Sequence, residues 1–109
     1  MSKPREYTKQ EVRDQFIGMV RTYVEYWSRV EKQSPKELLS GLAHSILCVL
    51  DGVAGTFPTV DMVISPHPDD KKFHQDEGEN WYADAPKEAS EAAFNDTMLH
   101  ELLYQGWKP

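Results

Sequence analysis

The sequence contains a single cysteine, Cys48, so an intrachain disulfide is impossible and a secreted fold held by disulfides is excluded. It also lacks a long hydrophobic run. The longest mostly apolar stretch, residues 42–53, is interrupted by polar residues and is too short to span a membrane. Residues 1–8 contain no apolar region of the kind that a signal peptide needs. These absences predict a cytoplasmic protein that does not associate with membranes.

Positive charge is scarce as well. The chain has 12 Lys and Arg residues against 18 Asp and Glu residues, which gives a formal net charge of −6. Direct binding to nucleic acid needs a basic stripe along the phosphate backbone, and an anionic membrane surface attracts basic segments. The charge therefore argues against both partners and fits either a protein whose charge simply keeps it soluble or one whose protein partner has a basic surface.

Several familiar motifs are missing from the sequence. It has no glycine-rich phosphate loop, no GxSxG elbow around a nucleophilic serine and no CxxC pair. Nothing in it builds a nucleotide site, and we predict no cofactor.

The residues that are present indicate a folded chain. Apolar residues make up 39% of the sequence, and three Trp, five Tyr and four Phe are too many for a disordered segment. A length of 109 residues suits one domain. We therefore predict a single domain over residues 1–109, with residues 1–7 as a flexible end.

Two helices are predicted in the first half of the chain. Thr8 and Glu11 form a capping-box pattern at the start of a helix that we expect to run to about Lys32. Its apolar stripe consists of Val12, Phe16, Met19, Val20, Tyr23, Trp27 and Val30. Residues 34–37 start a second helix, which Gly52 and Gly55 end. Apolar residues cover more than half of the second helix, so we expect it to be buried and antiparallel to the first.

The second half of the chain predicts a small sheet and a last helix. Residues 59–65 alternate between apolar and polar side chains, as a strand does, and residues 80–83 are the best candidate for its partner. Asn95 or Asp96 is expected to cap a C-terminal helix. The predicted fold class is therefore α+β: a helical hairpin packed on a small antiparallel sheet or β-hairpin, with a C-terminal helix.

The run Pro66-His67-Pro68-Asp69-Asp70 follows the predicted strand directly. Imidazole and carboxylate groups both suit zinc, so His67, Asp70 and the nearby His74 are candidate metal ligands. The run is similar to the PHPDD motif of zinc-dependent N-acetylglucosaminyl-deacetylase-like enzymes, and this resemblance implies that His67 and Asp70 are ligands and Asp69 a base. The chain departs from that family at Lys71, and it is too short for the family's large sheet. A turn bracketed by prolines is the alternative interpretation.

The wider segment, residues 65–82, ends in two large aromatic residues. Five carboxylates and two imidazoles lie between residues 67 and 79, and Trp81 and Tyr82 follow closely. Aromatic anchors beside a charged rim are typical of a recognition surface. The candidate binding residues are Asp69, Asp70, Glu77, Glu79, Trp81 and Tyr82. Alternatively, the acidic residues are simply solvated and Trp81 packs the segment onto the core.

The second predicted helix carries a third candidate site. His44, Cys48 and Asp51 are spaced so that they share one helix face. A cysteine and a histidine one turn apart can act as a nucleophile and its base, or as two metal ligands. A buried thiol and a hydrogen-bonded core histidine are the simpler interpretation. On the last helix, we expect His100 and Glu101 to form a surface pair.

Three blocks of the sequence together resemble a group of small, uncharacterised bacterial proteins. The blocks are residues 41–52, 65–82 and 99–102. The resemblance implies a bacterial or phage source, and it implies no particular activity. It also implies that the PHPDD run belongs to a framework smaller than that of the deacetylases.

Our leading prediction for function is a non-catalytic, acidic protein-interaction module that uses residues 65–82, such as an inhibitor, an immunity-type protein or a complex subunit. One alternative is a small metal-dependent hydrolase built on His67, Asp69, Asp70 and His74. The other alternative is a module that binds a small molecule or a peptide near His44 and Asp51.

Overall fold

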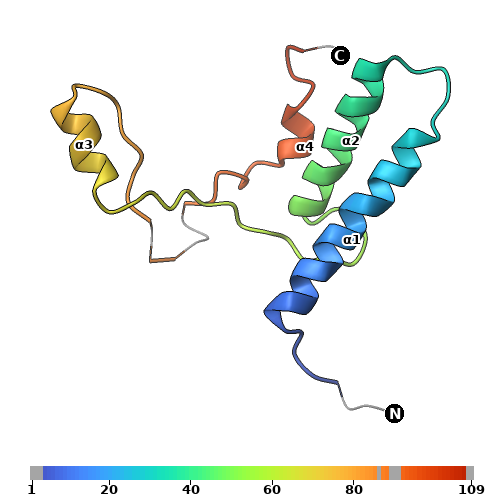
Figure 1. Ribbon diagram of the computed structural model, residues 1–109, viewed down its shortest axis with the longest axis horizontal. Helices are drawn as coiled ribbons and strands as arrows, with labels where there is room; N and C mark the ends of the chain where they lie inside the picture. Colours follow the sequence, from blue (N-terminus) through green and yellow to red (C-terminus); the bar gives the residue numbers. More distant parts are fainter. Residues whose placement is uncertain (1–3, 86, 89–91, 108–109) are drawn as a thin grey trace. The chain divides into compact units, whose positions relative to one another are not determined.

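The computed structural model describes residues 4–85, 87–88 and 92–107. Within this part of the chain it contains the helices α1 (Lys9–Ser28), α2 (Pro35–Leu50), α3 (Asp70–Asp76) and α4 (Leu99–Leu102), which are drawn in Figure 1. The chain divides into two compact units. The first unit is Met1–Thr59 with Leu99–Pro109, and the second unit is Val60–Met98.

Both predicted starts of the long helices are confirmed. Each begins with a capping box, in which the N-cap hydroxyl accepts the N–H of the glutamate three residues on and that glutamate accepts the N-cap N–H. The pairs are Thr8 with Glu11 and Ser34 with Glu37. Pro35 occupies the first turn of α2, where its missing N–H costs no helical hydrogen bond.

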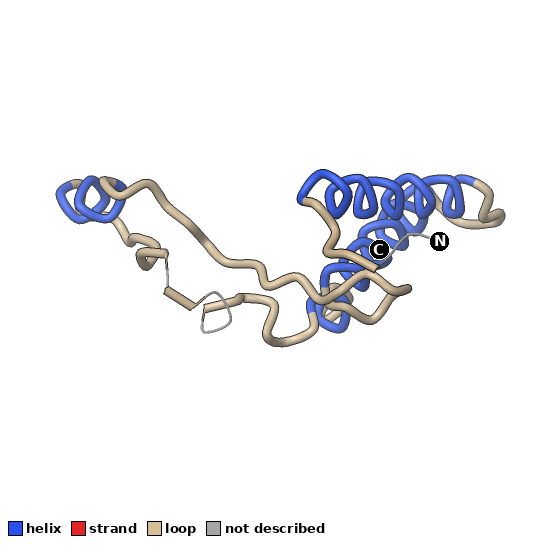
Figure 2. The backbone as a smooth tube through the Cα atoms, turned by 90° about the horizontal axis from the view of Figure 1, so that it is seen from below, coloured by secondary structure: helices blue, strands red, loops and turns tan. Residues whose placement is uncertain are grey.

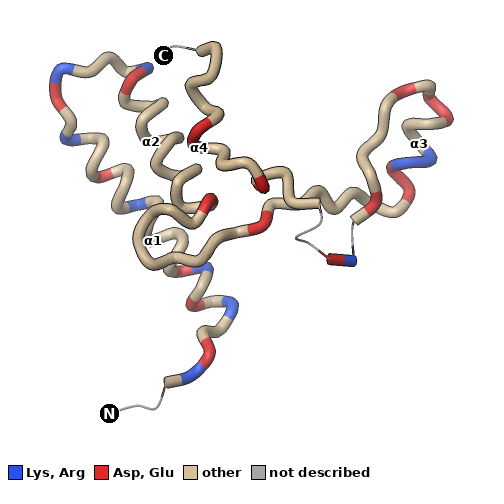
Figure 3. Tube along the Cα trace, turned by 180° about the vertical axis from the view of Figure 1, so that it is seen from behind, with Lys and Arg blue, Asp and Glu red and all other residues tan. Residues whose placement is uncertain are grey.

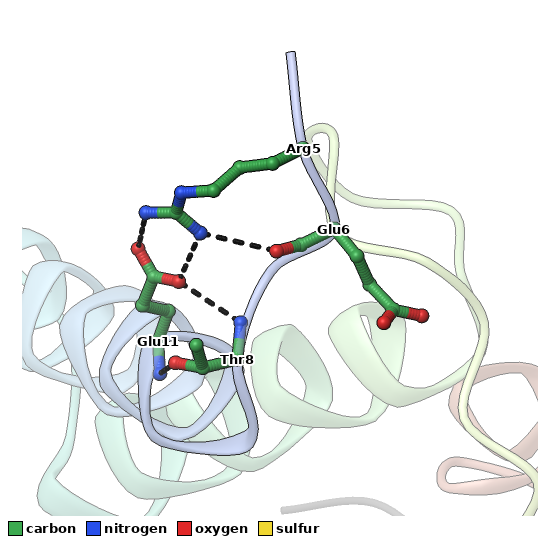
Figure 4. Close-up of polar contacts among 4 residues, drawn as sticks. All are labelled: Arg5, Glu6, Thr8 and Glu11. Atoms are coloured by element: carbon green, nitrogen blue, oxygen red, sulfur yellow. Dashed lines mark hydrogen bonds and ion pairs between the residues drawn. The ribbon is translucent and has the colours of Figure 1, made fainter. Parts of the chain in front are cut away.

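Arg5 strengthens the first capping box, as Figure 4 shows. Its guanidinium donates to both oxygens of Glu11 at 2.7 and 2.8 Å. These bonds, together with the bond from the N–H of Thr8, lower the pKa of Glu11 to about 2. Of the predicted flexible end, residues 1–3 lie outside the described residues, and Arg5 is held against α1.

The first helix is shorter than expected. It ends at Ser28 with Arg29 as its C-cap, whereas the sequence pattern predicts an end near Lys32. Lys32 has a φ of 63°, a left-handed conformation that cannot continue a right-handed helix. Helix α2 ends at the first of its two expected glycines, because Asp51 is its C-cap and Gly52 follows with a φ of 77°.

The antiparallel pairing of α1 and α2 depends on a close contact at Gly41. The indole of Trp27 lies where a Cβ on Gly41 would stand, with ring atoms 2.5–2.7 Å from that position. The indole N–H also donates to Ser45 Oγ at 2.9 Å. Beyond this contact, Phe16 meets Phe57 with ring centroids 5.8 Å apart, and Phe57 and Val49 are buried. These side chains form the small core of the first unit.

The expectation that α2 is a buried helix is met only in part. Only Ser40, Gly41 and Val49 of this helix are buried, and Leu39 and Ala43 are exposed. Helix α1 packs on one side of α2 and α4 packs on another, so a third side of α2 has no helix beside it. The apolar residues of α2 extend onto this third side.

The predicted α+β fold class is also wrong, because the described residues contain helices and no strand, as Figure 2 shows. Residues 59–65 are extended but do not pair with residues 80–83. Instead the N–H of Phe94 donates to Met62 O at 2.9 Å, and the side-chain amide of Asn95 bonds Met62 N and Val60 O. One amide side chain carries the same donor and acceptor as a peptide group, so Asn95 replaces a neighbouring strand at this point.

The contact at Gly41 predicts opposite effects for two glycine substitutions. Gly41→Ala should lower the free energy of unfolding by about 1–3 kcal/mol, because the new methyl group overlaps the Trp27 indole. Gly18→Ala on α1 is the matched control, since a Cβ there meets nothing within 4 Å. It should raise the stability by about 0.5–1 kcal/mol through helix propensity alone. Urea unfolding of both variants measures the difference, and equal effects would contradict this packing.

The role of Asn95 can be tested by hydrogen exchange. Asn95→Ala leaves Met62 N–H and Val60 C=O without their described partner, which should make the Met62 amide exchange at least about tenfold faster. Asn80→Ala is the control, because Asn80 is exposed. Unchanged exchange at Met62 in Asn95→Ala would show that the amide bridge does not hold residues 60–62.

Candidate functional site

The PHPDD run forms a turn that leads into α3. Asp70 Oδ2 accepts the N–H of His67 at 3.2 Å, and His67 Nδ1 accepts the N–H of Asp69 at 3.1 Å. The backbone N–H of Asp70 donates to His67 O at 3.0 Å. These bonds agree with the alternative interpretation of a proline-bracketed turn closed by Asp side chains.

The candidate metal ligands in this segment make hydrogen bonds with different partners. His67 and Asp70 bond within the turn, whereas His74 Nδ1 lies 3.4 Å from Glu79 Oε1. Across the described ranges, no group of three or more His, Cys, Asp or Glu side chains is placed to hold a metal ion. The structure therefore does not bring His67, Asp70 and His74 together as a ligand set.

The aromatic side chains of the 65–82 segment are open to solvent. Phe73 on α3 is 58% exposed, Trp81 47% and Tyr82 68%. Tyr82 also lines a shallow cavity of about 150 Å³ in the second unit, together with Ile64 and Phe94. Much of the apolar area of these residues is thus available to another molecule.

The predicted acidic residues belong to the same segment as these aromatic side chains. Asp69, Asp70, Glu77 and Glu79 are all exposed, and Figure 3 shows the acidic and basic residues along α3 and the turn after it. The backbone reverses after α3 at Gly78, whose φ of 69° suits glycine. This turn brings Glu79 back to His74, with Glu79 N donating to His74 O at 2.8 Å.

The third candidate site is built from more residues than the sequence indicated. His44 Nδ1 lies 3.8 Å from Cys48 Sγ, and the His44 ring stacks on Tyr104 with centroids 5.8 Å apart. His100 meets His44 edge to face at 5.6 Å. His44, Cys48 and Asp51 therefore do share one face of α2, and that face receives α4 and the residues after it.

Asp51 is the electrostatic centre of this cluster. Its side chain is fully buried, and Oδ2 accepts both the backbone N–H and the ring Nδ1 of His100 at 2.8 Å. Burial alone raises the pKa of Asp51, but the hydrogen bonds from His100 outweigh it and leave the pKa below its ordinary value of 3.8. An ionised Asp51 requires the proton on His100 Nδ1, so it sets the orientation and tautomer of that ring.

Cys48 does not have the properties of an activated nucleophile. Burial and the charge of Asp51 raise the pKa of its thiol above the ordinary value. The thiol is thus kept protonated, as in a small buried hydrophobic residue.

Two predictions for the last helix are wrong. His100 is not half of a surface pair, because it is largely buried against Asp51. Asn95 and Asp96 do not cap α4: Asn95 bonds residues 60–62, and Asp96 Oδ1 accepts the N–H of Thr97 at 2.8 Å. The first turn of α4 is capped instead by Asp51, a residue 49 positions away from His100 in the sequence.

The first unit also contains a cavity that no sequence motif indicated. Its volume is about 540 Å³, and its lining includes Tyr7, Met19, Tyr23 and Phe57. It lies along α1 rather than at the His44 cluster. None of the three cavities described here is lined by His44, Cys48 or Asp51.

Comparison with known proteins assigns no family. No family model matches the chain, and neither a curated protein nor a solved structure matches it. The resemblance to small bacterial proteins therefore stays a prediction. Among the helices described, none is both long and apolar enough to cross a membrane.

Asp51→Asn tests the electrostatic role of this carboxylate. At neutral pH it should cost about 2 kcal/mol, because bonds to a charged acceptor become bonds to a neutral one. The folded pKa of Asp51 is depressed, so its stabilisation is present above the unfolded pKa and is lost as pH falls through the folded value. The stability difference between wild type and Asp51→Asn should therefore shrink as pH falls from about 5 to 3.

The matched control is Asp14→Asn on α1, where the carboxylate is exposed. It should change the free energy of unfolding little at any of these pH values. Chemical denaturation at each pH measures both variants. A wild-type advantage over Asp51→Asn that stays constant down to pH 3 would contradict an ionised, hydrogen-bonded Asp51.

Proposed function

We propose that this protein is a non-catalytic interaction module that binds a partner protein with a basic surface through residues 65–82. The observation that carries the proposal is the exposure of Phe73, Trp81 and Tyr82 beside a set of acidic side chains. An inhibitor, an immunity-type protein and a subunit of a complex all use such a surface.

The small core of the second unit supports the proposal. Within its described residues, Ala93 is the only buried hydrophobic residue. Ordering a segment of this length costs conformational entropy that the burial of one alanine cannot offset. A partner that covers the aromatic side chains would supply the missing apolar burial.

Charge indicates the chemistry of the partner. Five carboxylates stand against Lys71 and Lys72 between residues 65 and 82, so the segment is acidic. In protein interfaces, aromatic side chains usually form the buried centre and charged residues form the rim, where they speed encounter with a complementary surface. The partner should therefore offer apolar pockets bordered by Lys or Arg.

The two alternatives have weaker structural support. The metal-dependent hydrolase needs a ligand set, and His67, Asp70 and His74 bond to different neighbours. The small-molecule binder needs an opening near His44 and Asp51, but α4 packs there and Asp51 is fully buried.

A site-specific cross-link tests the proposal directly. A photo-reactive phenylalanine analogue replaces Tyr82 in one strain and Tyr26 in another, and both strains are irradiated in the native cells. Tyr26 is the matched control, because it is an exposed tyrosine on α1. A discrete cross-linked protein with a basic surface is expected from position 82 and not from position 26. Equal yields at both positions would reject the 65–82 segment as the contact.

The contribution of the four acidic residues is tested on the partner protein that the cross-link identifies, once that protein has been purified. The quadruple variant Asp69→Ala, Asp70→Ala, Glu77→Ala and Glu79→Ala should bind at least about tenfold more weakly at low salt and lose most of the wild-type salt dependence. Trp81→Ala should weaken binding at every salt concentration, because it removes apolar contact rather than charge. Binding of the quadruple variant with unchanged affinity would rule out an electrostatic contact through this segment.

A further inference from the structure

The open side of α2 carries an apolar stripe with the spacing of a helix–helix contact. Its residues are Leu39, Ala43, Ile46 and Leu50, separated by four, three and four positions. Leu39 is 67% exposed, Ala43 is exposed, and Ile46 and Leu50 are half-buried. We propose that this stripe binds the same stripe on a second copy of the chain, with the two α2 helices antiparallel.

The stripe lies on a side of α2 that faces neither α1 nor α4. His44 stacks on Tyr104, and residues two positions apart on a helix point in nearly opposite directions, so Ile46 faces away from that contact. Gly41, which receives the Trp27 indole, marks the side that faces α1. The exposure of Leu39 and Ala43 agrees with this assignment.

Charge favours an apolar partner over a charged one. Residues 38–50 contain no Asp, Glu, Lys or Arg, and Figure 3 draws α2 in tan beyond its first turn. The one ionisable imidazole there, His44, belongs to the cluster on the other side. A basic or acidic partner would find no complementary charge on the stripe. A second uncharged stripe needs no such charge and therefore matches it.

The stripe is complementary to itself in size as well. In an antiparallel pair related by a two-fold axis between positions 44 and 45, Leu39 of one copy lies opposite Leu50 of the other. The same axis places the small Ala43 opposite the larger Ile46. Alternation of small and large side chains lets two helices approach closely and fills the space between them.

The neighbouring helix can extend the contact. Helix α2 is about 24 Å long, which by itself offers little area for a stable dimer. On α1, Ile17 and Val24 are also exposed. Ile17 lies two positions before Met19, which lines the 540 Å³ cavity, so it faces away from that cavity. Two helical pairs meeting in this way form a four-helix arrangement, which commonly buries such stripes.

This inference does not rest on the proposed function. The stripe belongs to the first unit and is apolar, whereas the 65–82 segment belongs to the second unit and is acidic. A dimer held by the stripe should keep its affinity as salt rises, in contrast to binding through the acidic segment.

Sedimentation analysis of the full chain at roughly 100 μM is the test. The wild type should have twice the 12.6 kDa mass of one chain. Leu39→Glu with Ala43→Glu should weaken dimerisation at least about 100-fold, because each copy brings two carboxylates into an apolar contact. Both positions are exposed in the single chain, so circular dichroism should show an unchanged helix content.

The matched control is Gln15→Glu with Thr22→Glu, which adds the same charge at exposed positions of α1 away from the stripe. It should remain dimeric. The single variant Ala43→Glu provides a second reading if the double variant loses helix content, and it too should shift the mass toward one chain. A monomeric wild type, or a dimer that both Glu variants leave intact, would overturn the proposal.

Discussion

The bond between Asp51 and His100 holds the first unit together across the longest stretch of sequence. It fastens the first turn of α4 to the end of α2, and it orients the His100 ring against His44. Next to Asp51, Gly52 leaves room for Thr59, since a Cβ on Gly52 would overlap Thr59 Oγ1. The chain therefore leaves the first unit and returns to it at the same end of α2.

This closure places a buried carboxylate against two hydrogen-bond donors. A buried carboxylate is costly unless hydrogen bonds compensate, and His100 supplies two of them to one oxygen. The same bonds hold His100 in place, and the His100 ring in turn packs against His44. The His44, Cys48 and Asp51 cluster is thus explained by the way the first unit is closed.

The limited apolar burial links the two surfaces that we propose as contacts. In the described part of the chain, Val49, Phe57 and Ala93 are the buried hydrophobic residues. The remaining large apolar side chains are half-buried or exposed, among them those of the α2 stripe and of the 65–82 segment. Because apolar burial is the main favourable term in folding, a chain with so small a core gains much from association. The two surfaces differ in kind, one apolar and self-matching and the other acidic and aromatic.

Local chemistry was sufficient to predict the starts of both long helices. A capping box involves residues three positions apart, so Thr8 with Glu11 and Ser34 with Glu37 carry the whole signal in a short window. Gly52 at the end of α2 is predictable for the same reason, because the left-handed conformation is a property of one residue. The turn at residues 67–70 was one of two interpretations that the sequence allowed, and its hydrogen bonds are equally local.

The starts of α1 and α2 and the residues that share a helix face are predictable from the amino-acid sequence, because they depend on neighbours within one or two turns. The conformation of residues 59–65 and the partners of Asn95 and His100 depend instead on contacts between distant parts of the chain. Alternating side chains make a segment suitable for a strand, but a strand forms only if another backbone lies alongside, and here the Asn95 side chain takes that place. The partner of His100 is likewise 49 residues away, and no local pattern encodes a contact that arises only when the chain folds back on itself.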